Sequence, residues 1–326
     1  MTLLRLLAAA AMAVTAAGTA MAEGAKFPER DQTLRLIVPF AAGGGVDSAA
    51  RLLGEQLRKQ LGMSVLVDNK AGASGTIGGK AVQTAPADGY TLLFSAATHV
   101  LANQVLTSPP YDPQADFAPV ARVGEAPLML VVSPQSSATK LADVLAAAKQ
   151  QQGNFTAAIP AAGAPSHLAT LLLAKQGNVT LTTIPYKGTQ PALTDVAGGH
   201  VSMLLDSMIS LLPLAKAGKV KPIAITSKQR SALAPEVPTV HEGGVTNYAY
   251  ASWYGVWAPK GTPADRVATL NTAINQAVSE LAKSGAFAKL GIDAVSETPE
   301  QFKRFIAADV AQSAELLKSA GFKPEQ

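Results

Sequence analysis

Short apolar runs along the chain alternate with longer stretches in which apolar residues have helical spacing. Leu34 to Val38 forms a run typical of a buried strand, and Pro39 ends it. From Ala49 to Leu61 apolar residues recur every three or four positions, which predicts an amphipathic helix. The same alternation continues through most of the chain. Strands separated by helical segments predict parallel β-α-β units with helices on both faces of each sheet.

The pattern predicts two open α/β domains. A proline-rich segment, 107–119, is expected to be an extended connection without regular structure, and 128–132 is expected to begin a second unit. We expect strands at 34–38, 65–67, 91–94, 128–132, 155–159, 182–184, 202–205 and 222–225, and helices at 47–61, 141–150, 166–175, 191–197, 209–217, 263–284 and 299–320.

The N-terminus has the pattern of a secretory signal peptide. Arg5 supplies a positive charge, residues 6–17 are uninterruptedly apolar, and Ala20-Met21-Ala22 matches the A-x-A pattern of a cleavage site. The apolar stretch is too short to cross a bilayer core of about 30 Å. We therefore predict export, with cleavage after Ala22 and a mature chain that begins at Glu23.

Composition narrows the possible chemistry. The chain of 326 residues has no cysteine, so disulfides, thiolate metal sites and cysteine nucleophiles are excluded. The net charge is +4, but the 27 Lys and Arg residues are scattered, which argues against a nucleic-acid partner. Export also disfavours dependence on ATP or NAD(P)H, so we predict no cofactor.

Catalytic motifs are present only in part. Gly72-Ala73-Ser74-Gly75-Thr76 lacks the second glycine of a nucleophile elbow. Ser137 and Lys140 satisfy S-x-x-K, but the motifs that accompany it in β-lactamases are missing. No two of the four histidines have metal-ligand spacing. The sequence therefore favours a protein that is not an enzyme and has no metal site. The alternative is a secreted hydrolase that uses Ser74 or Ser137.

The loops that follow the predicted strands consist mostly of small residues and carry almost no charge. Open parallel sheets bind ligands at the carboxyl ends of their strands, where loops lead into helices. Gly, Ala, Ser and Thr dominate these loops, which favours recognition by backbone N–H groups and helix N-termini, and so an anionic ligand. The loops are 40–47, 70–79, 95–99, 160–167, 187–190 and 206–210.

Several blocks of sequence resemble one known family. Val38-Pro39-Phe40-Ala41-Ala42-Gly43-Gly44-Gly45-Val46-Asp47 is similar to the first loop of the substrate-binding proteins of tripartite tricarboxylate transporters, the TctC or Bug family. Further matching blocks lie at 67–78, 86–93, 184–188, 235–239, 257–263 and 298–302. The blocks cover essentially the whole mature chain.

The resemblance implies a two-domain periplasmic binding protein of the type II-like, Venus-flytrap kind, with open, mostly parallel sheets. Domain 1 would be discontinuous (23–124 plus 249–326), domain 2 would be 125–248, and the ligand cleft would lie between them. The expected function is a monomeric periplasmic receptor that closes on a small organic acid and delivers it to membrane permease subunits. A di- or tricarboxylate or an aromatic acid is expected; the alternative is a ligand sensor for a membrane signalling kinase.

The resemblance and the loop positions together predict the ligand-binding residues. From domain 1 these are Phe40, Ala41, Gly43, Gly44, Ser74, Gly75, Ser95 and Thr98, and from domain 2 Gly163, Ser166, His167, Gly188, Thr189 and Asp206. Asp47 is expected to cap a helix or brace the first loop, because a bare carboxylate would repel an anion. For Trp253 and Tyr254, core packing is expected ahead of a place in the cleft wall.

Overall fold

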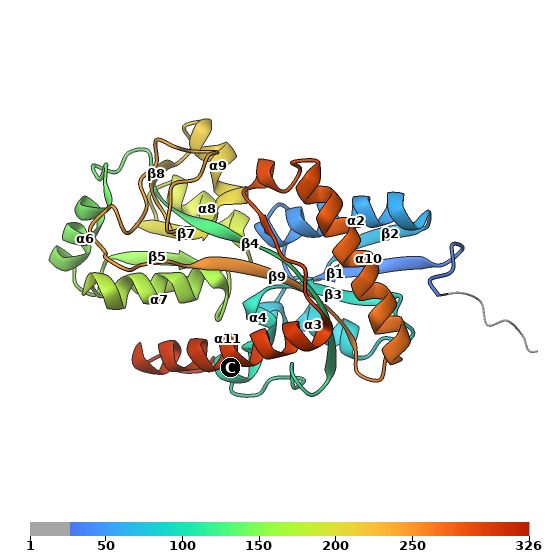
Figure 1. Ribbon diagram of the computed structural model, residues 1–326. Helices are drawn as coiled ribbons and strands as arrows, with labels where there is room; N and C mark the ends of the chain where they lie inside the picture. The colour runs from blue at the N-terminus through green and yellow to red at the C-terminus, as the bar shows by residue number, and fades with distance from the viewer. Residues whose placement is uncertain (1–26, 326) are drawn as a thin grey trace, which may run out of the picture.

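A computed structural model describes residues 27–325, and the predicted signal peptide lies outside them (Figure 1). The strands form two groups, which define two lobes. Lobe 1 contains β1, β2, β3, β9, β10 and the first part of β4; lobe 2 contains the end of β4 and β5 to β8. The bounds are β1 Thr33–Val38, β2 Ser64–Asn69, β3 Thr91–Ser95, β4 Phe117–Val132, β5 Thr156–Ile159, β6 Thr182–Pro185, β7 Met203–Ser207, β8 Lys221–Ile225, β9 Ala251–Pro259 and β10 Asp293–Ala294.

The sheet order is β2-β1-β3-β9-β4-β7-β5-β6, with β8 and β10 also paired to β4. In lobe 1, β1 is parallel to β2 and β3; in lobe 2, β5 is parallel to β6 and β7. This arrangement confirms the predicted α/β class. The strands β4 and β9 pair antiparallel with each other and with their other neighbours.

β4 passes from one lobe to the other. It pairs with β9 from Phe117 to Pro127 and then with β7 from Leu128 onward. The prediction that 107–119 lacks regular structure was therefore wrong at its end, and 128–132 continues a strand that has already begun. Pro119 is tolerated because the pairing register shifts between Pro119 and Ala121, where a backbone N–H is not required.

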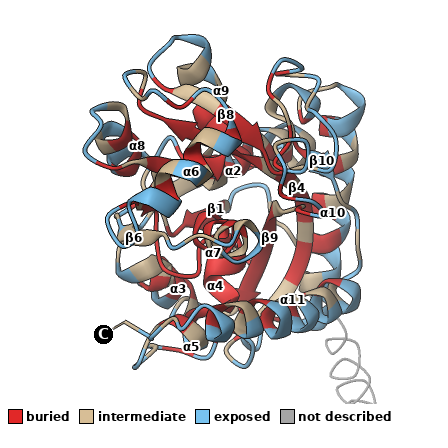
Figure 2. Cartoon of the chain, turned by 90° about the vertical axis from the view of Figure 1, so that its left-hand side faces the viewer, coloured by how far each residue is buried: buried red, intermediate tan, exposed pale blue. Residues whose placement is uncertain are grey.

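Helices cover both faces of each sheet. In lobe 1, α2 buries Ala49, Leu53 and Leu57 in a core that it shares with α10. The helices are α2 Gly45–Leu61, α3 Thr76–Gln83, α4 Ala97–Val100, α5 Ala102–Val105, α6 Leu141–Gln150, α7 Pro165–Gly177, α8 Thr189–Ala197, α9 Met208–Lys216, α10 Ala264–Lys283 and α11 Pro299–Ser319, with 3₁₀ turns η1 Ala73–Gly75 and η2 Ala288–Leu290. Figure 2 shows the buried residues concentrated on the strands and on the inward faces of these helices.

The C-terminal helix contacts both lobes. α11 packs beside β4 and also against α7 of lobe 2, where Lys175 Nζ donates to Ser319 Oγ at 3.1 Å. Just beyond the helix, the Phe322 ring lies edge-on to His167, with 5.1 Å between the ring centroids. Among the described helices none is long and apolar enough to cross a membrane.

Candidate ligand-binding site

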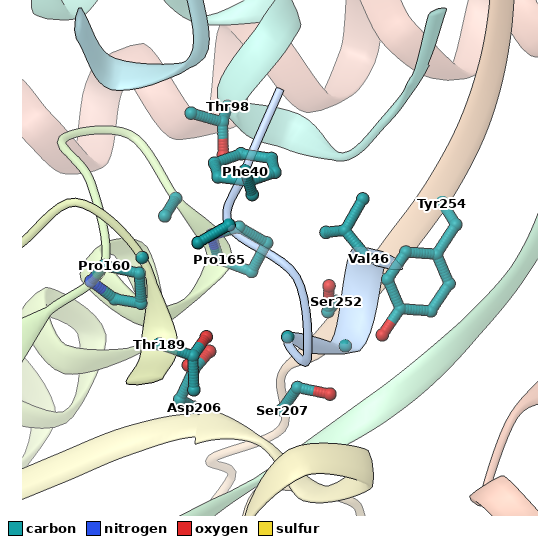
Figure 3. Close-up of a pocket in the computed structure, with 15 residues that line it drawn as sticks. Phe40, Val46, Thr98, Pro160, Pro165, Thr189, Asp206, Ser207, Ser252 and Tyr254 are labelled. Atoms are coloured by element: carbon teal, nitrogen blue, oxygen red, sulfur yellow. The ribbon is translucent and has the colours of Figure 1, made fainter. Parts of the chain in front are cut away.

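A cavity of about 40 Å³ lies between the two lobes (Figure 3). Loops that follow β1 and β3 line it from lobe 1, and loops that follow β5, β6 and β7 line it from lobe 2. These are five of the six loops in which the sequence predicted a ligand. The lining residues are Phe40, Ala41, Gly44, Gly45, Val46, Thr98, Pro160, Ala164, Pro165, Gly188, Thr189, Asp206, Ser207, Ser252 and Tyr254.

Four helices begin at this cavity. Their N-cap residues are Gly44 (α2), Ala164 (α7), Gly188 (α8) and Ser207 (α9), and none makes a side-chain capping hydrogen bond. The first N–H groups of a helix have no partner within the helix, and the helix dipole gives this end a partial positive charge. The wall therefore offers backbone donors suited to an anion.

Three buried hydroxyl groups at the cavity add further donors. Thr98 Oγ1, Ser207 Oγ and Tyr254 Oη have no hydrogen-bond partner among the described residues, although the three residues are only 1%, 6% and 1% exposed. Burial raises the pKa of Tyr254 to about 12, although the Ser207 and Ser252 hydroxyls near it act to lower it, so the Tyr254 hydroxyl keeps its proton. Buried polar groups are normally satisfied, so three unsatisfied hydroxyls at one cavity indicate a polar ligand.

One carboxyl group lies in the same wall. Thr189 Oγ1 donates to Asp206 Oδ2 at 2.7 Å. Burial raises the pKa of Asp206, against the opposing effect of the hydrogen bonds from Thr189 and the Ser207 backbone N–H. Within the described range, 27–325, no lysine, arginine or histidine lines the cavity.

Asp47 supports the loop after β1 through hydrogen bonds. Its Oδ2 accepts the Gly43 N–H at 2.9 Å, and its Oδ1 accepts Asn69 Nδ2 at 2.9 Å. Arg51 Nε donates to the same carboxylate at 3.0 Å. Although burial acts to raise the pKa of Asp47, these hydrogen bonds and the Arg51 charge hold it below the usual value. Asp47 thus acts as the brace that the sequence predicted.

Direct contacts join the lobes beside the cavity. The Gly43 carbonyl accepts hydrogen bonds from Gln190 Nε2 at 3.3 Å and from Ser210 Oγ at 3.4 Å, both in lobe 2. Gly45 packs against Ser207, and Gly44 packs against Thr189. The structure therefore describes the lobes in a closed arrangement.

Seven of the fourteen predicted residues line the cavity. They are Phe40, Ala41, Gly44, Thr98, Gly188, Thr189 and Asp206. Gly43 lies at the lobe contact just described. Gly75 packs behind Phe40, since a Cβ on Gly75 would lie 3.7 Å from the end of that ring. Ser74 is in the same 3₁₀ turn, and Ser95 is fully buried at the end of β3 without lining the cavity.

The remaining three residues, at the start of α7, use their polar atoms within lobe 2. Ser166 Oγ donates to the Leu205 carbonyl at 2.5 Å, and His167 Nδ1 accepts the Gly163 N–H at 3.1 Å. Burial lowers the pKa of His167 to about 4, so the ring is neutral near neutral pH. Binding roles for these residues stay predictions.

Sequence reasoning missed part of the wall. Ser207 comes directly after Asp206 at the end of β7, and its place in the predicted loop 206–210 is its only sequence signal. Tyr254 was expected in the core, and its ring does stack on Phe94 with centroids 6.2 Å apart, while its hydroxyl lies at the cavity. The other unpredicted lining residues are Gly45, Val46, Pro160, Ala164, Pro165 and Ser252.

Comparison with known proteins identifies the family. Residues 49–322 match the TctC family, described as the tripartite tricarboxylate transporter family receptor. The chain belongs to this family. The TctC match confirms the resemblance inferred from the loops, and members of the family are periplasmic solute-binding receptors.

Individual TctC-like proteins cover nearly the whole chain. Protein BugT of Bordetella pertussis is 37% identical over 326 residues, covering 99% of both sequences. The structure of R. palustris Rpa4515 with adipate has a TM-score of 0.86 and 33% identity, covering 92% of this chain and 100% of that one. MatC from Rhodopseudomonas palustris with bound malate has a TM-score of 0.81 and 30% identity, covering 89% of this chain and 100% of that one.

Proposed function

We propose that the protein is a periplasmic receptor that captures a small organic carboxylate between its lobes and delivers it to a tripartite tricarboxylate-type permease. The observation that carries this proposal is the cavity wall, in which three unpartnered hydroxyls and four helix N-termini meet. Two similar structures hold adipate and malate, which are carboxylates. The predicted di- or tricarboxylate or aromatic acid remains the expected range of ligands.

Binding requires the lobes to open and close. A water molecule needs about 10–15 Å³ of cavity space, so the cavity has room for a few waters but not for an organic acid. The acid therefore enters when the lobes separate, and closure brings hydroxyls of both lobes onto its carboxylate. Because the ligand contacts both lobes, it favours the closed form, which the membrane partner then recognises.

The hinge of this motion is proposed to lie in β4 and β9. Both strands belong to the antiparallel pair that runs from lobe 1 toward lobe 2, and β4 changes its partner between Pro127 and Leu128. This change supports the division into domain 1 (23–124 plus 249–326) and domain 2 (125–248).

We propose that the receptor performs no chemical step. Ser74 and Ser137, the two candidate nucleophiles, do not line the cavity, and neither hydrogen-bonds a histidine in the described part of the chain. Within residues 27–325 no group of three or more His, Asp or Glu side chains is placed to hold a metal ion. We further propose that the receptor is a monomer and that a signal peptide, cleaved after Ala22, directs its export.

Thermal-shift screening against organic acids, followed by calorimetric titration, tests the proposal. Each acid is paired with its neutral primary amide, which has nearly the same shape but no negative charge. A true ligand at 100 times its Kd stabilises the folded state by about 2.7 kcal/mol, and the paired amide is expected to give much less. If no acid binds, or if amides bind as tightly as their acids, the proposal fails.

A further inference from the structure

The cavity has one strong acceptor among many donors. Among the residues that the structure describes, Asp206 is the only carboxyl group that lines it, and no cationic side chain lies beside it in the wall. Asp206 is also 7% exposed, so it is largely removed from solvent. A buried carboxylate without a cationic partner is costly, and burial raises its pKa, so a hydrogen-bond donor on a ligand would stabilise its charged form.

Thr189 fixes the position of this acceptor. Its hydroxyl donates to Asp206 Oδ2 at 2.7 Å, and Thr189 is the one side chain in the described residues that hydrogen-bonds Asp206. A carboxylate has about four acceptor positions, so Asp206 retains capacity for a donor in the cavity. Figure 3 shows the Thr189 and Asp206 side chains close together, with Thr98 and Phe40 at the far side of the cavity.

The wall is therefore not uniform in chemistry. Thr98, Tyr254 and the start of α2 present donors from lobe 1, and Ser207 and the starts of α7, α8 and α9 add donors from lobe 2. Among the described wall residues, Asp206 is the one place where a carboxyl group presents an acceptor. A second carboxylate placed at Asp206 would set two acceptors of like charge against each other, whereas a hydroxyl or an ammonium group would form a hydrogen bond there.

We infer that Asp206 determines specificity, and that the ligand is a carboxylate whose second polar group is a hydroxyl or an amine. This inference rests on the proposed function, because it assumes that the cavity binds a carboxylate. It narrows the expected ligands to carboxylic acids that also carry a hydroxyl or an amino group. A dicarboxylate without such a group is expected to bind more weakly.

Two matched series of acids test the inference by calorimetry. The first is butyrate, γ-hydroxybutyrate, γ-aminobutyrate and succinate, and the second is hexanoate, ε-hydroxyhexanoate, ε-aminohexanoate and adipate. Within each series only the terminal group changes. In the wild type, the hydroxy or amino member is expected to bind about tenfold tighter than the diacid of the same length.

The Asp206→Asn variant keeps the size of the side chain and removes its charge. It is expected to weaken binding of the amino acid about tenfold and to strengthen binding of the diacid. Asp195→Asn is the matched control, because Asp195 accepts the Tyr186 hydroxyl at 2.6 Å on α8 and does not line the cavity. The control should reproduce the wild-type order of affinities.

A diacid that binds the wild type as tightly as its hydroxy and amino counterparts overturns the inference but leaves the carboxylate receptor intact. The same holds if Asp206→Asn leaves the affinity for the tightest acid unchanged. Failure of every acid, in these series and in the wider screen, overturns the proposed function itself.

Discussion

Gly45 and Ser207 face each other across the two lobes with no room for another atom. A Cβ added at Gly45 would lie 2.2 Å from Ser207 Oγ and 2.6 Å from Ser207 Cβ. Such distances are far below van der Waals contact, so the lobes could not close fully around an alanine. We therefore expect Gly45→Ala to weaken ligand binding about tenfold or more, as measured by calorimetry.

A double variant separates this effect from a general loss of structure. Ser207→Gly removes both atoms that the new methyl group would strike. Gly45→Ala/Ser207→Gly should bind the ligand more tightly than Gly45→Ala alone, even though one hydroxyl of the wall is lost. If the double variant binds no better, closure does not depend on this contact.

Thr98→Val should change stability and binding in opposite directions. The Thr98 hydroxyl is buried without a partner in the described residues, so valine is expected to leave the ligand-free protein equally stable or about 1–2 kcal/mol more stable. Binding of the acid should weaken about 10- to 100-fold, because a hydrogen-bond donor is lost. Chemical denaturation and calorimetry measure the two effects.

Thr170→Val is the control for this prediction. Thr170 is also fully buried, but its hydroxyl donates to the Ser166 carbonyl at 2.7 Å. Its replacement should affect stability without a comparable loss of affinity. Equal loss of affinity in both variants would show that Thr98 acts only through the fold.

Asp47→Ala should loosen the first loop. The carboxylate holds the Gly43 N–H, Asn69 and Arg51 together while its side chain is only 4% exposed. We expect a loss of about 1–3 kcal/mol in the free energy of unfolding, because buried donors lose their partner. The pKa of Asp47 is lowered in the fold. Its stabilising effect is therefore present above the unfolded-state pKa and is lost as pH falls through the folded-state pKa, so wild type and variant should converge in acid.

The side chain of His99 should make the protein less stable as pH falls. The ring lies among aromatic side chains, 4.5 Å from Phe117 and 4.8 Å from Trp257 between centroids, and burial lowers its pKa to about 3. The unfolded chain takes up the proton below about pH 6.5, whereas the fold resists it. The contribution of neutral His99 to the free energy of unfolding is therefore fully present above about pH 6.5, and it declines as pH falls from 6.5 toward 3.

His99→Phe keeps the aromatic packing and removes the titration. The difference in unfolding free energy between wild type and variant should shift by about 1.4 kcal/mol per pH unit between pH 6 and pH 4. His200→Gln, at an exposed position, should follow the wild-type curve. If the free energy of unfolding depended on pH equally in His99→Phe and in the wild type, burial of neutral His99 would not be a source of the pH dependence.

The strands and helices of the β-α-β units could be predicted because each has a local signal. Leu34 to Val38 is an apolar run, and α2 has apolar residues at helical spacing. β4 lacked such a signal at its start, because Pro119 and the prolines before it argue against a strand. Its pairing with β9 joins residues more than a hundred positions apart, and no local pattern contains that information.

The candidate site shows the same limit. Phe40, Gly44 and Thr189 were found because loops after parallel strands lead into helices. Tyr254 was missed because its ring belongs to the core and only the folded structure shows where its hydroxyl lies. Ser166 shows the reverse case. It lies in a loop that reaches the cavity, as predicted, but its hydroxyl donates to the Leu205 carbonyl of β7, a partner that the sequence near Ser166 does not reveal.

A crystal structure of the protein with the tightest-binding acid tests the central claim most directly. The account predicts closed lobes with one carboxylate within hydrogen-bond distance of donors from both, including Thr98 or Tyr254 of lobe 1 and Ser207 or the start of α8 in lobe 2. An acid bound to one lobe alone, or in another cavity, would contradict it.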